Sequence, residues 1–183
     1  LHQRRIHRRS DGGRRIMSHQ RVLGIDPGTA IVGWGIVEGD EQEMALVGHG
    51  VIRTPANLPL VERISLIYDG INQLLDEHQP RGVGVEQLFF ARNVTTALPV
   101  AHARGVILLA VHQRGLPLVE FTPMQVKQAI TGYGSADKQQ MQQMVRLLLG
   151  LDEIPRPDDA ADAVAIAICY HQTARYSQLT GPQ

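Results

Sequence analysis

The sequence predicts an α/β layer fold with a mixed sheet of about five strands flanked by helices. Three strand-like apolar runs come first, and a turn signal at residues 38–41 indicates that they form an antiparallel meander. Two further strands then alternate with helical segments, which is typical of an α/β protein. A length of 183 residues with 43% hydrophobic residues suits one domain with a substantial core.

The strand predictions rest on short apolar runs that end at turn residues. In the opening run, apolar residues stop at Asp26 and are followed by Pro27 and Gly28. Because proline fixes φ and glycine tolerates unusual φ, we expect Asp26 on a rigid corner at the sheet edge. A carboxylate there can bind a metal ion, act as a general base or cap the turn. The other strand-like runs are residues 31–37, 44–53, 82–86 and 116–121.

Helices are predicted from apolar spacing and from capping signals. Within residues 59–78, the residues expected on one buried stripe are Val61, Ile64, Ile67, Ile71, Leu74 and Leu75. Within residues 93–114, the expected buried positions include Leu98, Val106, Leu109 and Ala110. Thr122 opens the next helix with a capping-box pattern, and residues 132–134 end it. Ser135 is the predicted cap of a helix to Leu149, and residues 158–174 form the last helix.

Charge and cysteine content suggest how the chain is divided and where it works. Residues 1–20 hold six arginines and one acid, which leaves 12 basic and 17 acidic residues in the remainder. We expect residues 1–20 to be a disordered basic leader or a mis-assigned start, with a DNA-binding arm as the alternative. Residues 21–174 would form the folded domain and residues 175–183 a flexible tail. A single cysteine, Cys169, fits the cytoplasm, and no apolar run is long enough to span a membrane.

Four carboxylates form the candidate chemical site. Asp26 and Glu86 end predicted strands, whereas Asp159 and Asp162 lie one turn apart on an otherwise apolar helix. An alternative is that these acids only complement the helix dipole, as acids in a first helical turn do. That role suits Asp158 as a cap, but it suits Asp162 poorly because Asp162 lies a full turn into the helix. Convergent carboxylates without a cysteine or histidine cluster favour Mg²⁺ or Mn²⁺. Two such ions could assist the displacement at a phosphodiester.

Six motifs occur in order with matching gaps: residues 25–28 (IDPG), 85–89 (VEQLF), 102–105 (HARG), 125–128 (QVKQ), 134–138 (GSADK) and 159–162 (DAAD). On these motifs the sequence resembles the RuvC-type Holliday junction resolvases across residues 21–171. The resemblance implies a ribonuclease H-like fold and a homodimer that nicks four-way DNA junctions in pairs during recombination and repair. It also implies cooperation with the RuvA–RuvB branch-migration complex.

The resemblance further implies how the site would work. Asp26, Glu86, Asp159 and Asp162 match the catalytic metal-binding carboxylates of the family, with two Mg²⁺ ions per active site and Mn²⁺ able to substitute. Asp26 would be shared by both ions, Glu86 and Asp162 would complete the coordination, and Asp159 would hold or tune one ion. Lys127 matches a family position close to the active site.

Basic and aromatic residues are the candidate DNA contacts. Lys138 is expected three residues after the cap Ser135, where a cation opposes the helix dipole but helps to form an anion site. Either Lys127 or Lys138 could neutralise the scissile phosphate. By resemblance, Phe89 lies in a loop that meets unpaired bases, on which an aromatic ring can stack. The weaker candidates for phosphate contacts are Arg92, Arg104 and Arg146.

Three other hypotheses remain. The first is a related ribonuclease H-like nuclease that acts on structured RNA or another branched DNA. The second is an actin-like nucleotide-binding protein, suggested by residues 26–29, although such proteins need a second phosphate loop and a longer chain. The third is a junction-binding scaffold without catalysis, against which the four intact carboxylates argue.

Overall fold

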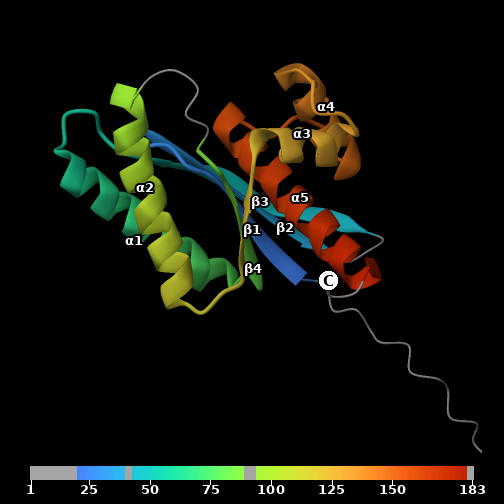
Figure 1. Cartoon of the computed structure of the whole chain (residues 1–183), viewed down its shortest axis with the longest axis horizontal. Helices are drawn as coiled ribbons and strands as arrows, with labels where there is room; N and C mark the ends of the chain where they lie inside the picture. The colour runs from blue at the N-terminus through green and yellow to red at the C-terminus, as the bar shows by residue number, and fades with distance from the viewer. Residues whose placement is uncertain (1–19, 40–42, 89–93, 181–183) are drawn as a thin grey trace, which may run out of the picture.

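The computed structural model describes residues 20–39, 43–88 and 94–180 (Figure 1). Within these ranges five strands form one sheet in the order β3-β2-β1-β4-β5. The strands are β1 (Gln20–Asp26), β2 (Ile31–Gly39), β3 (Met44–Arg53), β4 (Gly82–Glu86) and β5 (Leu118–Phe121). The first three pair antiparallel, whereas β4 pairs parallel with both β1 and β5. The predicted mixed sheet and its opening meander are therefore confirmed.

Helices cover both faces of the sheet (Figure 1). One face carries α1 (Leu60–His78) and α2 (Val94–Gln113), which pack on each other. The other face carries α5 (Asp158–Thr180), with α3 (Pro123–Thr131) and α4 (Lys138–Leu148) packed against it. None of the described helices is long and apolar enough to cross a membrane.

Alternating side chains divide the core into two clusters, one on each face of the sheet. On β1, Leu23 and Ile25 join the cluster under α1 and α2, whereas Val22 joins the cluster under α5. This arrangement follows from the two-residue period of a strand, which points successive side chains to opposite faces. Because both faces of β1 are buried, its apolar run is continuous instead of alternating between apolar and polar residues.

Glycines let α5 lie close to the sheet. A Cβ added at Gly24 would lie 2.0 Å from the carbonyl oxygen of Ala163, and one at Gly33 would lie 2.0 Å from that of Asp159. Gly33 pairs with Asp26 across β1 and β2. The first turn of α5 is therefore fixed beside the end of β1.

Some predicted boundaries and buried positions are wrong. Val61, Leu98 and Leu109 are 73%, 58% and 48% exposed, because they point away from the sheet. The spacing of apolar residues identifies a helix but not which of its apolar residues another element covers. Helix α5 continues to Thr180, six residues beyond the predicted end of the last helix at residue 174.

Candidate active site

The four candidate carboxylates come from three elements that meet at one edge of the sheet. Because β1 and β4 are parallel neighbours, their last residues, Asp26 and Glu86, lie at the same edge. Asp159 and Asp162 lie in the first turns of α5, whose start packs on Gly33. The structure therefore brings together the four carboxylates that the sequence analysis selected.

Burial and repulsion from neighbouring carboxylates raise the pKa values of Asp26, Glu86 and Asp162. Burial, followed by the charges of Glu86, Asp162 and Asp159, raises the pKa of Asp26 to about 8. Burial and the charge of Asp162 raise the pKa of Glu86 to about 7, although the charge of Lys127 opposes that shift. Burial also raises the pKa of Asp162. Such a cluster favours either protons or a bound cation.

Two consecutive hydrogen bonds hold the turn after Asp26 in place. Gly28 makes this turn because a Cβ there would lie 2.2 Å from a carbonyl oxygen of β2. The hydroxyl of Thr54 donates to the carbonyl of Thr29 at 2.6 Å, and Nε of Arg63 donates to that hydroxyl at 2.9 Å. The sequence analysis missed Thr54 and Arg63, since no spacing rule links the end of β3 to the loop after β1.

Lys138 lies among acidic side chains at the start of α4. Its Nζ lies 3.2 Å from a carboxylate oxygen of Asp158 and 3.5 Å from one of Asp162. Burial lowers the pKa of Lys138, but the bonds and charges of these two acids outweigh it, so the pKa is raised overall. The lysine is therefore charged and held beside the candidate site.

The predicted cap of α4 is wrong. Asp137, not Ser135, is the N-cap residue, and it forms a capping box with Gln140. Lys138 is consequently the first residue of the helix rather than the third after the cap. A carboxylate is as good a cap as a hydroxyl, and the residue three positions later decides between them: the Gln140 side chain accepts from the Asp137 N–H at 3.0 Å, whereas a lysine such as Lys138 has no acceptor.

Lys127 lies on α3, where it is electrostatically coupled to Glu86. The predicted capping box of α3 is confirmed: the Gln125 N–H donates to the Thr122 hydroxyl at 3.1 Å, and the Thr122 N–H donates to the Gln125 side chain at 2.8 Å. This box sets the start of α3 directly after β5, at the same sheet edge as Glu86. Lys127 therefore lies close enough for its charge to oppose the raised pKa of Glu86, and its role at the site stays a prediction.

The remaining predicted DNA contacts have different outcomes. Arg104 donates a hydrogen bond to Glu120 on β5, and its side chain is only 21% exposed. This pairing links α2 to the sheet, so the phosphate contact of Arg104 stays a prediction. Phe89 and Arg92 lie outside the described residues.

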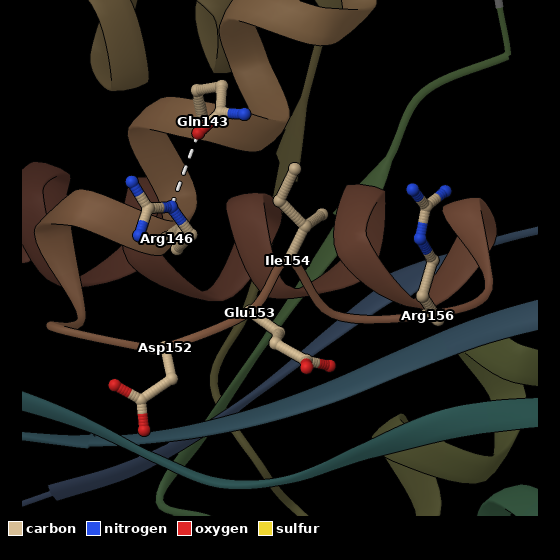
Figure 2. A pocket seen from close by; sticks show the side chains of 6 residues that line it. All are labelled: Gln143, Arg146, Asp152, Glu153, Ile154 and Arg156. Atoms are coloured by element: carbon tan, nitrogen blue, oxygen red, sulfur yellow. Dashed lines mark hydrogen bonds between the residues drawn. The ribbon is translucent and has the colours of Figure 1, made fainter.

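A polar pocket of about 360 Å³ is lined by none of the four candidate carboxylates (Figure 2). Its lining residues are Gln143, Arg146, Asp152, Glu153, Ile154 and Arg156. Nε of Arg146 donates to Gln143 at 3.2 Å, and the guanidinium also reaches the carbonyl of Leu151 at 3.5 Å. Arg146 therefore secures the end of α4, and its phosphate contact stays a prediction.

The donor set of the candidate site fits a hard divalent cation. Among the residues that the structure describes, no three acidic, histidine or cysteine side chains are gathered into a ready metal cage. Mg²⁺ does not need one, because it is usually held by one or two carboxylates together with water and substrate phosphates. Burial and then the neighbouring carboxylates raise the pKa values of Asp26 and Glu86, and a bound cation would favour the ionised form of both groups.

Comparisons with known proteins agree with this arrangement. A family model described as crossover junction endodeoxyribonuclease RuvC matches residues 22–170. A protein of that description from Thermomicrobium roseum is 58% identical over 159 residues, which cover 87% of this chain and 97% of the relative.

Solved structures agree as well. The structure of Thermus thermophilus RuvC in complex with a Holliday junction substrate has a TM-score of 0.83 and 39% identity, covering 87% of this chain and 97% of that one. The yeast mitochondrial Holliday junction resolvase Ydc2, at 16% identity and a TM-score of 0.63 over 91% of this chain and 87% of its own, shares the fold. The ribonuclease H-like fold is therefore confirmed, and the chain belongs to the RuvC family of crossover junction endodeoxyribonucleases.

Proposed function

We propose that the protein is a structure-specific endonuclease that resolves Holliday junctions by paired, symmetric nicks in DNA recombination and repair. The observation that carries the proposal is the convergence of four carboxylates at one sheet edge, where burial and then the charges of the other three raise the pKa of Asp26 to about 8. Membership of the RuvC family supports the same substrate.

In this proposal Asp26, Glu86, Asp159 and Asp162 hold two Mg²⁺ ions per active site, and Mn²⁺ can substitute. When bound, the ions supply an activated water and stabilise charge on the leaving oxygen. Lys127 and Lys138 neutralise the scissile phosphate and the charge that develops on it. Asp26 is at the centre because each of the other three carboxylates contributes to its pKa.

We also propose that the active form is a homodimer. One face of α2 carries an exposed stripe at helical spacing, which consists of Leu98, His102, Gly105 and Leu109. Exposed leucines beside a glycine suit close packing of a second copy of the same helix. The family resemblance adds the RuvA–RuvB complex as a partner, and DNA as the substrate together with a lone cysteine supports a cytoplasmic location.

The test is the variant Asp26→Asn, assayed on a synthetic four-way junction with Mg²⁺. We expect junction binding to persist and cleavage to fall by more than about 100-fold, since altering even the outer shell of a metal site costs about 10–100-fold. Cleavage at the wild-type rate would contradict the assignment. Asp152→Asn, which alters an exposed carboxylate outside the cluster, is the matched control.

The substrate class needs a separate comparison. Wild-type protein should cut the four-way junction faster than a duplex, a flap or a structured RNA of the same length. Equal rates on all four substrates would contradict junction specificity and favour a general nuclease with this fold.

A further inference from the structure

Asp158 is the centre of a polar cluster beside the candidate site, although the sequence analysis gave it only the role of a helix cap. One carboxylate oxygen accepts hydrogen bonds from Nε2 of Gln142 at 3.0 Å and from the guanidinium of Arg156 at 2.9 Å. The other oxygen lies 3.2 Å from Nζ of Lys138. Asp158 is itself the first residue of α5, so it is helical rather than a preceding cap.

These contacts fix both the charge and the direction of the Asp158 carboxylate. The hydrogen bonds from Lys138 and Gln142 lower its pKa, so it stays ionised. Gln142 is buried, with 8% of its surface exposed, and it holds one carboxylate oxygen from α4. The other oxygen is thereby directed at Lys138.

Lys138 contacts two acids, of which only one is a proposed metal ligand. Asp162, at 3.5 Å, is one of the proposed metal ligands, whereas Asp158 is not. A cation bound by Asp162 competes with Lys138 for the same carboxylate and also repels the lysine. A lysine side chain has several flexible bonds and is readily drawn into solvent when it loses its partners.

We propose that Asp158 is a positioning residue that keeps Lys138 beside the site when a metal ion occupies Asp162. Nζ of Lys138 then remains available to the scissile phosphate instead of turning into solvent. The inference rests on the proposed function, because it concerns the same reaction. Asp158 acts only through Lys138 and touches neither the metal ion nor the DNA.

A double-mutant cycle separates this role from simple helix stabilisation. Asp158→Asn keeps an oxygen for Gln142 and Arg156 but removes the charge that holds Lys138. We expect it to slow junction cleavage by roughly tenfold in the wild-type background, within the usual range of coupling between contacting residues. In a Lys138→Met background the same change should alter the rate less than about twofold, because the coupling partner is gone.

Junction binding gives a readout that does not depend on cleavage. Affinity for a fluorescent four-way junction is measured in EDTA and in Ca²⁺, with a denaturing gel to verify that the DNA stays intact. In EDTA, Asp162 still holds Lys138, so Asp158→Asn should bind like wild type. In Ca²⁺, which is another oxygen-binding cation, the variant should bind several-fold more weakly. Asp152→Asn should match wild type under both conditions.

Three outcomes would overturn the inference: equal losses of affinity in EDTA and Ca²⁺, multiplicative effects in the cleavage cycle, or wild-type behaviour of Asp158→Asn throughout. Thermal melting of each variant verifies that it is folded. A wild-type protein that cuts no four-way junction would contradict the proposed function instead, and the comparison of affinities would still decide the role of Asp158.

Discussion

At the scale of single residues, the surroundings of each acid decide its charge. Asp26 and Asp158 lie in the same region, yet their pKa values shift in opposite directions. Burial and three neighbouring carboxylates raise the pKa of Asp26, whereas hydrogen bonds from Lys138 and Gln142 lower that of Asp158. Asp26 therefore suits a site that receives a cation, and Asp158 suits a fixed partner for a lysine.

The raised pKa of Asp26 predicts a pH-dependent effect on stability. Between its ordinary value of 3.8 and its folded value of about 8, the unfolded chain loses a proton that the folded chain retains, so stability falls as pH rises. Asn carries no such proton. In EDTA at pH 8, the unfolding free energy of Asp26→Asn should therefore exceed that of wild type by about 1–3 kcal/mol. At pH 5 the difference should be smaller.

Thermal melts at the two pH values check this prediction. The exposed substitution Asp152→Asn should show no comparable pH-dependent gain. If Asp26→Asn changed the melting temperature equally at pH 5 and pH 8, the pKa of Asp26 would not be raised in the folded protein.

The sequence was sufficient for the four carboxylates but not for the residues that support them. Asp26 and Glu86 follow recognisable apolar strands, and Asp159 and Asp162 are one helical turn apart, so local patterns found them. The hydrogen bonds from Arg63 to Thr54 and from Thr54 to the loop after Asp26 connect residues that are distant in sequence, since Thr54 is 25 residues from Thr29. No local pattern encodes such a contact, because it depends on how the elements pack.

At the scale of elements, the close packing of α5 on the sheet determines where its carboxylates lie. The glycines of β1 and β2 allow backbone to approach backbone, and the parallel pairing of β1 with β4 brings their ends to one edge. The mixed sheet with its opening meander could be predicted from the sequence, since a turn signal follows the second strand and helical segments separate the later ones. The exposed face of α2 could not be, because apolar spacing does not identify a partner outside the chain.

Gly33→Ala should damage both stability and catalysis. Its Cβ would lie 2.0 Å from the carbonyl oxygen of Asp159, so the first turn of α5 must move. We expect a loss of about 1–3 kcal/mol in unfolding free energy, as is usual for overpacking. Cleavage should fall further than the folded fraction does, since that turn carries a proposed metal ligand. Urea unfolding and junction cleavage, measured on the same preparation, check this.

Gly82→Ala is the matched control, because it affects α5 near its middle rather than in its first turn. Its Cβ would lie 2.3 Å from the hydroxyl of Tyr170, which is 11 residues, or about 16 Å, from Asp159 along the helix. This variant should lose stability while its folded fraction cleaves normally. Equal losses of activity per folded molecule in the two variants would contradict a local effect on the site.

At the scale of the whole molecule, each chain gathers one candidate site, yet a four-way junction presents two opposed strands to be cut. The carboxylates of one chain meet at a single edge of its sheet, whereas the exposed stripe of α2 lies on a helix that covers one face. A second copy docked through α2 would therefore leave both sites open to DNA, as a symmetric dimer on a symmetric substrate requires.

Paired cutting by such a dimer predicts the behaviour of mixed subunits. Wild-type and Asp26→Asn proteins, mixed and allowed to exchange subunits, should form dimers with one active site. On a supercoiled plasmid with an extruded cruciform, two nicks release linear DNA and one nick leaves an open circle. The mixture should therefore shift the product towards open circles, compared with wild type at the same concentration of active sites. An unchanged ratio would indicate that each subunit cuts independently, because an inactive neighbour would then have no influence on the second strand.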